Sequence, residues 1–245
     1  MKKKQKDHSH PGYWIPTFTP YPGNELILSP GLVYSFPVMD DLQCVMLAAG
    51  GSTRMDTWKM MLPWGSSTII EYSVGTALKV CSRVILVVGF RAQELIDVFG
   101  DQPQVEVVKN PDYQAGMFSS VQIGVRAVAE GSFFLALADM PGVREGTYGD
   151  LLEWSGKLSR GFAAKQSPYA VIPQYRGKKG HPLLLSAEMR ARILQTDLSK
   201  TLRDVLAGVP TVIVPADEPG VLHDIDTPAD YRSWSPQRDS AGDSR

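Results

Sequence analysis

The strongest constraint on the fold is a regular alternation of apolar, strand-length segments with helix-patterned segments after residue 42. The apolar segments are residues 43–48, 83–88, 105–108 and 132–138. The helix-patterned segments between them are residues 69–80, 94–99 and 118–129. Parallel strands are buried on both faces, and their sequences are therefore apolar almost throughout. The pattern predicts an α/β fold with a mostly parallel central sheet and helices on both faces.

The chain divides into three predicted parts. Residues 1–41 are rich in proline and aromatic residues, lack a helical period, and contain a weak hairpin pattern at 25–28 and 32–36. We predict an N-terminal extension over residues 1–41, one α/β domain over residues 42–232, and a flexible polar tail over residues 233–245. The less regular second half of the domain predicts strands at 170–173, 182–185, 211–214 and 221–225, and helices at 187–194 and 200–206.

Composition excludes several classes of protein. With 25 Lys and Arg against 26 Asp and Glu, the net charge of −1 gives no electrostatic reason to expect a nucleic-acid partner. The longest apolar stretch is shorter than the roughly 18 residues of a membrane span. The N-terminal lysines lead into Pro11 and Gly12 rather than an apolar segment, which argues against a secretory signal. Cys44 and Cys81 lie in apolar segments, so we expect two reduced, buried thiols in a cytoplasmic protein.

The loop after the first strand has the composition of an anion-binding turn. Its sequence is LAAGGSTRM (residues 47–55), and Lys59 follows it. Small residues let the backbone approach a ligand closely, and successive N–H groups in such a turn form a concavity for anions. Arg54 and Lys59 would add two cations for phosphate oxygens. In open α/β sheets, ligands bind outside the carboxyl ends of the strands, where this loop would lie.

The loop matches neither of the common phosphate-binding motifs. It lacks the G-x-x-x-x-G-K-[ST] pattern of a P-loop and the G-x-G-x-x-G pattern of a dinucleotide-binding turn. The residues alone therefore leave two interpretations open, a phosphate site and an ordinary strand-to-helix turn with two exposed cations.

Two aspartates are predicted to follow strands at the same edge of the sheet. Asp139 comes directly after an apolar segment, and Asp226 has a similar setting near the C-terminus. Mg²⁺ sites often combine one or two carboxylates with substrate phosphates and water, so this pair beside a phosphate loop suggests a magnesium site. Alternatively, Asp139 is a turn former before Pro141, and Asp226 caps the helix that begins near Pro228.

The full set of motifs resembles the MobA-like NTP transferase family. The family signature has the form L-A-A-G-x-S-x-R-M-G…K…L-P, matched here by residues 47–63. Further matches follow in the family's order over residues 43–231: NPDY at 110–113, GM at 116–117, SSV at 119–121, ADMP at 138–141, GHP at 180–182 and DIDTP at 224–228. Asp56 departs from the signature, because the family usually has glycine there. This carboxylate would repel a triphosphate.

The resemblance implies a Rossmann-like three-layer nucleotidyltransferase fold and transfer of a nucleoside monophosphate from an NTP to a phosphorylated acceptor. Ala-Ala-Gly at 48–50 and residues 116–120 are similar to the cytidylyl-transferring branch, which favours CTP as the donor. For that branch the acceptor is molybdenum cofactor, the by-product is pyrophosphate, the metal is Mg²⁺, and a molybdenum hydroxylase is a possible partner.

The motifs also assign roles to individual residues. The expected catalytic residues are Arg54, Lys59 and Asp139. The expected nucleotide-binding residues are Leu47, Ala48, Ala49, Gly50, Gly51, Ser52, Arg54, Lys59, Gly89 and Ser119. Gly180 and His181 are expected to contact the acceptor, and Asp139 and Asp226 are expected to hold the metal.

Three alternatives remain at this point. A methylerythritol phosphate cytidylyltransferase shares the Leu-Ala-Ala-Gly start, but usually has Pro-Lys-Gln where this chain has Lys59 followed by Met60. A sugar-phosphate nucleotidyltransferase is a more distant possibility. A non-catalytic carrier of molybdenum cofactor, docking on a hydroxylase through residues 1–41, belongs to a different functional class.

Overall fold

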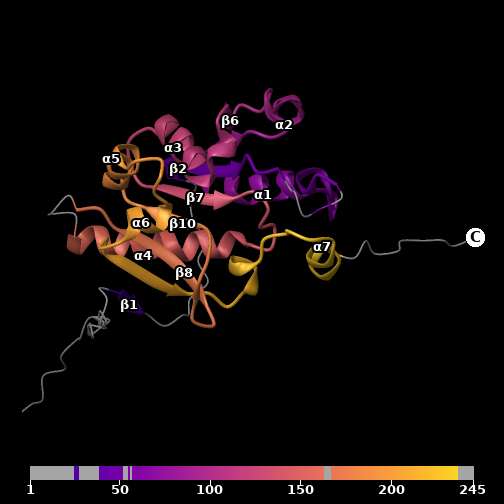
Figure 1. The fold of residues 1–245 in the computed structure, drawn as a ribbon. Helices are drawn as coiled ribbons and strands as arrows, with labels where there is room; N and C mark the ends of the chain where they lie inside the picture. Colours follow the sequence, from indigo (N-terminus) through magenta and orange to yellow (C-terminus); the bar gives the residue numbers. More distant parts are fainter. Residues whose placement is uncertain (1–24, 28–38, 52–54, 56, 163–166, 237–245) are drawn as a thin grey trace, which may run out of the picture.

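The computed structural model describes residues 25–27, 39–51, 55, 57–162 and 167–236. Its centre is a nine-stranded sheet with the order β1-β11-β8-β10-β7-β2-β5-β6, and β9 pairs with β8 (Figure 1). The strands of this sheet are β1 (Glu25–Ile27), β2 (Met39–Ala48), β5 (Cys81–Val88), β6 (Val105–Lys109), β7 (Phe133–Leu137), β8 (Ala170–Tyr175), β9 (Lys178–Lys179), β10 (Leu183–Leu185) and β11 (Thr211–Pro215). A small separate hairpin contains β3 (Pro63–Trp64) and β4 (Ser67–Thr68).

The helices alternate with these strands. The α-helices are α1 (Ile69–Leu78), α2 (Ala92–Phe99), α3 (Met117–Ala127), α4 (Glu145–Phe162), α5 (Glu188–Gln195), α6 (Leu202–Leu206) and α7 (Pro228–Trp234). The described residues also form three short 3-10 helices, η1 (Lys59–Met61), η2 (Tyr113–Ala115) and η4 (Pro219–Leu222). No helix in the described part of the chain has the length and apolar content needed to cross a membrane.

The sheet is mostly parallel, as predicted. Strands β7, β2, β5 and β6 are parallel neighbours, and so are β1, β11 and β8. Within the described strands of this nine-stranded sheet, only β10 and the short β9 run antiparallel to their partners. Because the parallel strands share one direction, the loops that follow β2, β5 and β7 emerge at the same edge of the sheet.

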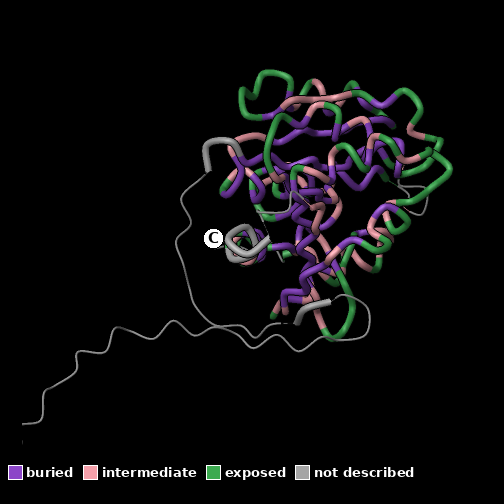
Figure 2. Tube along the Cα trace, turned by 90° about the vertical axis from the view of Figure 1, so that its left-hand side faces the viewer, coloured by how far each residue is buried: buried purple, intermediate pink, exposed green. Residues whose placement is uncertain are grey.

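Helices cover both faces of the sheet and form a three-layer α/β fold. In β2, Cys44 and Met46 face a core shared with α1, α2 and α4. The alternate residues Val45 and Leu47 face a second core shared with α3, α5 and α6. This alternation follows from the two-residue period of a strand, and Figure 2 shows the buried segments lying inside more exposed ones. The mostly parallel α/β architecture is therefore confirmed.

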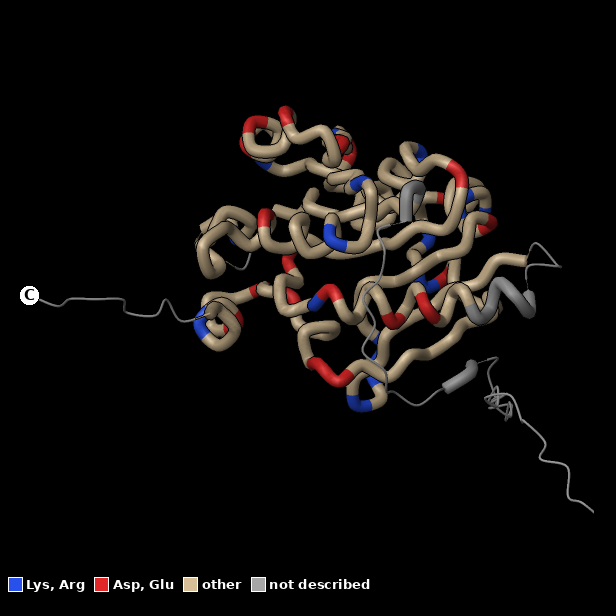
Figure 3. The backbone as a smooth tube through the Cα atoms, turned by 180° about the vertical axis from the view of Figure 1, so that it is seen from behind, with Lys and Arg blue, Asp and Glu red and all other residues tan. Residues whose placement is uncertain are grey.

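Cys44 and Cys81 are both buried and free, as predicted. Lysines, arginines and acidic residues are interspersed along the described trace, in keeping with a net charge close to zero (Figure 3).

The long helix α4 was not predicted from the sequence. Four glycines interrupt its 18 residues, and each interior glycine costs a helix about 1 kcal/mol relative to alanine. Burial compensates for this weak propensity, because Tyr148 and Leu151 pack in the core that α4 shares with β2. The ring of Phe134 meets that of Tyr148 edge-on at a centroid distance of 5.0 Å.

Two other segments differ from the expectation. The strand predicted at 221–225 is wrong: this segment contains the end of η4 and an extended loop, and the Ile225 N–H donates to the carbonyl of Asp139 at 2.8 Å. Within the predicted extension, β1 pairs in parallel with β11 at the edge of the sheet. The second half of the suggested hairpin, residues 32–36, lies outside the described residues.

Candidate active site

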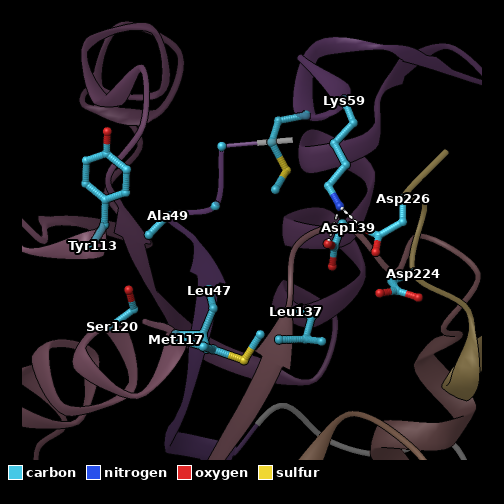
Figure 4. A pocket seen from close by; sticks show the side chains of 13 residues that line it. Leu47, Ala49, Lys59, Tyr113, Met117, Ser120, Leu137, Asp139, Asp224 and Asp226 are labelled. Atoms are coloured by element: carbon cyan, nitrogen blue, oxygen red, sulfur yellow. Dashed lines mark hydrogen bonds and ion pairs between the residues drawn. The ribbon is translucent and has the colours of Figure 1, made fainter. Parts of the chain in front are cut away.

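A pocket of about 330 Å³ lies at the edge of the sheet where β2 and β7 end (Figure 4). Its floor contains Leu47 and Leu137, the residues near the ends of those two strands, and the backbone of Ala49, Gly50 and Gly51 forms one side. The Ala138 N–H donates to the carbonyl of Leu47 at 3.1 Å, which continues the pairing of β2 and β7 up to the pocket.

One side of the pocket is charged, and we name it the acid wall: Lys59, Asp139, Asp224 and Asp226. The Lys59 ammonium donates to Asp139 Oδ2 at 2.7 Å and to Asp226 Oδ1 at 2.6 Å. The lysine side chain is only 6% exposed, and the two carboxylates are 18% and 21% exposed. Charge-assisted hydrogen bonds of this length are strong, and partial burial protects them from screening.

The electrostatic environment of the acid wall favours a charged lysine. Burial by itself would lower the pKa of Lys59, but the charges and hydrogen bonds of Asp139 and Asp226 outweigh it, and the pKa is raised. Burial raises the pKa of the Asp224 carboxyl, and the neighbouring charge of Asp226 raises it further. The cluster is therefore organised around one buried cation between acids that repel each other.

A small apolar cluster brings Asp226 to the pocket from the far end of the chain. Ile225 is buried against Trp64 and Ile69 of the segment β3–α1, and Tyr231 and Trp234 of α7 pack on the same cluster. The Tyr231 hydroxyl donates to the Pro63 carbonyl at 2.6 Å. The hydrogen bond from Ile225 N–H to the Asp139 carbonyl then fixes the two acidic segments side by side.

The opposite side of the pocket is uncharged, and we name it the tyrosine wall: Tyr113, Met117 and Ser120. Asn110, which is 1% exposed, organises it. The Asn110 amide donates to the hydroxyls of Ser119 and Ser120, both at 2.9 Å, and its side-chain oxygen accepts from the Asp112 N–H at 3.0 Å. These bonds fold residues 110–120 back on themselves, so that η2 and the first turn of α3 border the pocket.

Gly89 holds the tyrosine wall close to the loop after β2. A Cβ atom at this position would lie 2.6 Å from Tyr113 Cβ and 2.9 Å from the Ala49 carbonyl oxygen, which is sterically forbidden. The following residue, Phe90, donates its N–H to that same carbonyl at 3.2 Å. Gly89 thus permits the close approach of three segments without lining the cavity itself.

The structure brings seven of the predicted site residues to the pocket: Leu47, Ala49, Gly50, Gly51, Lys59, Asp139 and Asp226. Ala48 lies beneath the pocket, because it points into the core on the other face of β2. Ser119 is buried next to Ser120 and bonds to Asn110 and to the Gly116 carbonyl. Ser52, Arg54 and Asp56 lie outside the described residues. The roles assigned to all of these residues stay predictions.

The two residues predicted to contact the acceptor lie beside the pocket, in the turn before β10. A Cβ at Gly180 would lie 2.1 Å from the Val221 carbonyl oxygen, and the His181 N–H donates to that carbonyl at 2.8 Å. Burial lowers the pKa of His181, although the Leu135 carbonyl and the charge of Asp224 oppose this. Both residues border a wider cavity of about 850 Å³ that Lys179 and Arg203 also line.

His181 also borders a small internal cavity. Ser73 and Thr76 of α1 and Tyr148 of α4 line it together with the histidine. His181 Nδ1 and Ser73 Oγ are buried there without a hydrogen-bond partner among the described residues. The imidazole is therefore packed between helices rather than projecting into the pocket that contains Lys59.

Sequence reasoning missed several residues that line the pocket: Met60, Tyr113, Met117, Ser120, Leu137 and Asp224. Two signals were available. Tyr113, Met117 and Ser120 lie in motifs that carried the family resemblance. Asp224 is two residues from Asp226, and in an extended segment such residues point to the same side.

The acid wall has the donor set of a site for a hard divalent cation. Oxygens of Asp139, Asp224 and Asp226 lie within 4.8 Å of one another. Carboxylate oxygens are the ligands that Mg²⁺ and Mn²⁺ prefer. The Lys59 ammonium already occupies a cation position between two of these carboxylates, so the residues present fit a divalent ion.

Comparison with known proteins identifies the family. The model of the MobA-like NTP transferase domain matches residues 44–218. The chain belongs to this family. The residues that match the family model include the loop after β2, Lys59 and Asp139. The match ends shortly before Asp224 and Asp226. The chain is accordingly a nucleotidyltransferase.

Individual relatives agree with this assignment. This MobA-like NTP transferase is 34% identical over 193 residues to the molybdenum cofactor cytidylyltransferase of Escherichia coli, which covers 79% of this chain and 95% of the relative. A nucleotidyl transferase from Methanothermobacter has a TM-score of 0.62 at 25% identity, covering 80% of this chain and 96% of that one. A manganese complex of Rv0371c from Mycobacterium tuberculosis has a TM-score of 0.60 at 21% identity, covering 79% and 97%.

Proposed function

We propose that this nucleotidyltransferase transfers CMP from CTP to the terminal phosphate of molybdenum cofactor and releases pyrophosphate. One observation carries the proposal: in a MobA-like domain, Lys59 and three carboxylates meet in the pocket that follows the strand-end loop. Such a pocket combines a cation for phosphate oxygens with ligands for a divalent ion.

The choice of CTP and of the acceptor has independent support. The loop carries Ala48, Ala49 and Gly50, the small-residue pattern associated with cytidylyl transfer. The relative that is 34% identical is named a molybdenum cofactor cytidylyltransferase. A molybdenum hydroxylase is the proposed recipient of the product, because it would use the cofactor in its nucleotide form.

The residues of the pocket divide the chemical work between binding and charge neutralisation. The backbone of residues 49–51 would cradle the triphosphate, with Arg54 as a further cation. An oxygen of the acceptor phosphate attacks the α-phosphorus in line, and the bond to the bridging oxygen of pyrophosphate breaks. The attacking phosphate is already ionised, so no base is required. Lys59 would stabilise the negative charge that develops on the α-phosphate.

A divalent cation completes the proposed site. Asp139 and Asp226, with Asp224 beside them, would hold Mg²⁺ or Mn²⁺. When bound, the ion supplies charge neutralisation for the phosphate oxygens. The manganese complex of the structural neighbour supports a divalent ion in this fold, and the chemistry of NTP substrates makes Mg²⁺ the proposed physiological metal.

The acceptor is proposed to bind on the side of Gly180 and His181. The wider cavity there carries two cationic side chains, Lys179 and Arg203, which suit an anionic ligand. Leu183 lines this wider cavity, and Leu47 lines the pocket that contains Lys59. Both leucines belong to the core that α3, α5 and α6 cover, so the cavity and the pocket border the same layer of the fold.

The decisive experiment measures pyrophosphate release. The purified full chain is incubated with molybdenum cofactor and Mg²⁺, and with CTP, GTP or ATP in separate reactions. We expect pyrophosphate with CTP, and no release when either the acceptor or the metal is omitted. Preference for GTP would contradict the assigned donor. Release with methylerythritol phosphate in place of molybdenum cofactor would contradict the acceptor, and cofactor binding without any release would indicate a carrier.

A further inference from the structure

The Lys59 ammonium occupies the position that the proposed metal site needs. It donates to Asp139 at 2.7 Å and to Asp226 at 2.6 Å, and an oxygen of Asp224 lies within 4.8 Å of oxygens of these two carboxylates. A bound Mg²⁺ lies about 2.0–2.1 Å from its oxygen ligands. The ammonium and the ion would therefore compete for the same carboxylate oxygens, and two cations at such a distance repel each other strongly.

The backbone of Lys59 is held in place by its surroundings. It begins η1, and its carbonyl accepts from the Leu62 N–H at 3.1 Å. The flanking residues Trp58 and Met60 are 6% and 2% exposed, so the backbone around Lys59 is packed into the core. This lysine is thus unlike Lys79, whose side chain is 63% exposed and pairs with Glu145 on the surface.

From this geometry we infer that Lys59 reserves the cation site of the free protein, so that the divalent ion binds with the nucleotide and not before it. The inference rests on the proposed function for the identity of the nucleotide and of the metal. A triphosphate in the pocket carries more negative charge than either carboxylate, and Lys59 lines the same pocket. The flexible lysine stem can then turn its ammonium from the acids to the phosphates, which leaves the carboxylates available to the ion.

Lys59 would have a second consequence for the nucleotide-free protein. Asp139 and Asp226 come from segments 87 positions apart in the sequence (226 − 139), and their charges repel each other. The ammonium neutralises this repulsion while no metal is bound, and so supports the backbone hydrogen bond from Ile225 to Asp139 that joins the two segments. Without the lysine, the carboxylates should therefore bind another cation more tightly.

The test measures Mn²⁺ binding to the protein without nucleotide. Electron paramagnetic resonance of free Mn²⁺ gives the dissociation constant for the wild type, Lys59→Met and the matched surface control Lys79→Met. We expect Lys59→Met to bind Mn²⁺ at least about tenfold more tightly than the wild type, because the competing charge is gone. Lys79→Met should equal the wild type. Adding Asp226→Asn to Lys59→Met should abolish the gain. Equal affinity of the wild type and Lys59→Met would overturn the inference.

A second measurement covers the case in which Lys59→Met does not fold. The melting temperature of the wild type is recorded with MnCl₂ alone, with CTP alone, and with both. We expect a substantial rise only when both are present. A comparable rise with MnCl₂ alone, lost in Asp226→Asn, would contradict the inference.

The two proposals can fail separately. If pyrophosphate release shows that CTP is not the donor while Lys59→Met still binds Mn²⁺ more tightly, the proposed function fails and the role of Lys59 stands. If CTP is turned over normally but the wild type binds Mn²⁺ as tightly as Lys59→Met, the function stands and the role of Lys59 fails.

Discussion

The two walls of the pocket are built in different ways. The tyrosine wall comes from one continuous segment, residues 110–120, which Asn110 organises through neutral hydrogen bonds. The acid wall joins side chains that are 80 and 167 positions apart in the sequence, and its contacts are charged. From this comparison we propose that the tyrosine wall shapes the pocket, whereas the acid wall, whose assembly depends on the whole fold, carries the chemistry.

The largest effect is expected for Asp139→Asn, which keeps the shape of the acid wall but removes a charge. We expect kcat to fall by about 10³-fold or more, because the proposed ligand of the metal and a partner of Lys59 are lost together. Steady-state pyrophosphate release measures it. The exposed Asp101→Asn is the matched control and should behave as the wild type. Near-normal metal-dependent turnover in Asp139→Asn would show that the acid wall is not the reacting side.

A smaller loss of activity is expected for Lys59→Ala. Loss of one donor to the transition state typically lowers kcat by about 10²-fold. The same assay on Lys79→Ala controls for the removal of a lysine. A change in KM alone, with normal kcat, would mean that Lys59 only helps to bind the nucleotide in its ground state.

Asn110→Ala tests whether the tyrosine wall acts through shape. We expect the free energy of unfolding to fall by about 1–3 kcal/mol, because buried partners lose their hydrogen bonds. KM for CTP should rise more than kcat falls. Urea unfolding and steady-state kinetics measure the two effects, and the exposed neighbour Gln114→Ala is the control. If kcat fell as far as in Asp139→Asn, the division of labour between the walls would be wrong.

The smallest expected effect concerns His181, beside the acid wall, and is a change in how the free energy of unfolding depends on pH. Burial lowers the pKa of this histidine in the folded protein. Below pH 6.5 the unfolded chain therefore binds a proton that the folded protein does not, and the free energy of unfolding falls as the pH drops further. His181→Gln should lose this part of the pH dependence, as measured by urea unfolding between pH 7.5 and 5.5. Parallel pH profiles of the two proteins would contradict the buried, neutral state of His181.

Residue patterns predicted most of the sheet. The apolar segments predicted as strands are strands in the structure: β2, β5, β6, β7, β8 and β11. They could be recognised because a strand that is buried on both faces is apolar almost throughout. Helix α4 escaped prediction because its propensity is weak and its stability comes from packing on the sheet. The segment near residue 221 misled the prediction because an apolar residue can be buried in a loop as well as in a strand.

By itself, the sequence determined the layered α/β architecture, the position of the loop after β2, and the candidate acids at positions 139 and 226. These features depend on local composition and on the rule that ligands bind beyond the carboxyl ends of parallel strands. Only the tertiary structure decided that Lys59 lies between the two acids, that Asp224 joins them, and that Tyr113 lines the opposite side of the pocket. The physical reason is that Ile225, Trp64 and Tyr231 dock the C-terminal segment against the edge of the sheet. Such packing between distant segments produces no periodic pattern of apolar residues that could be recognised in the sequence.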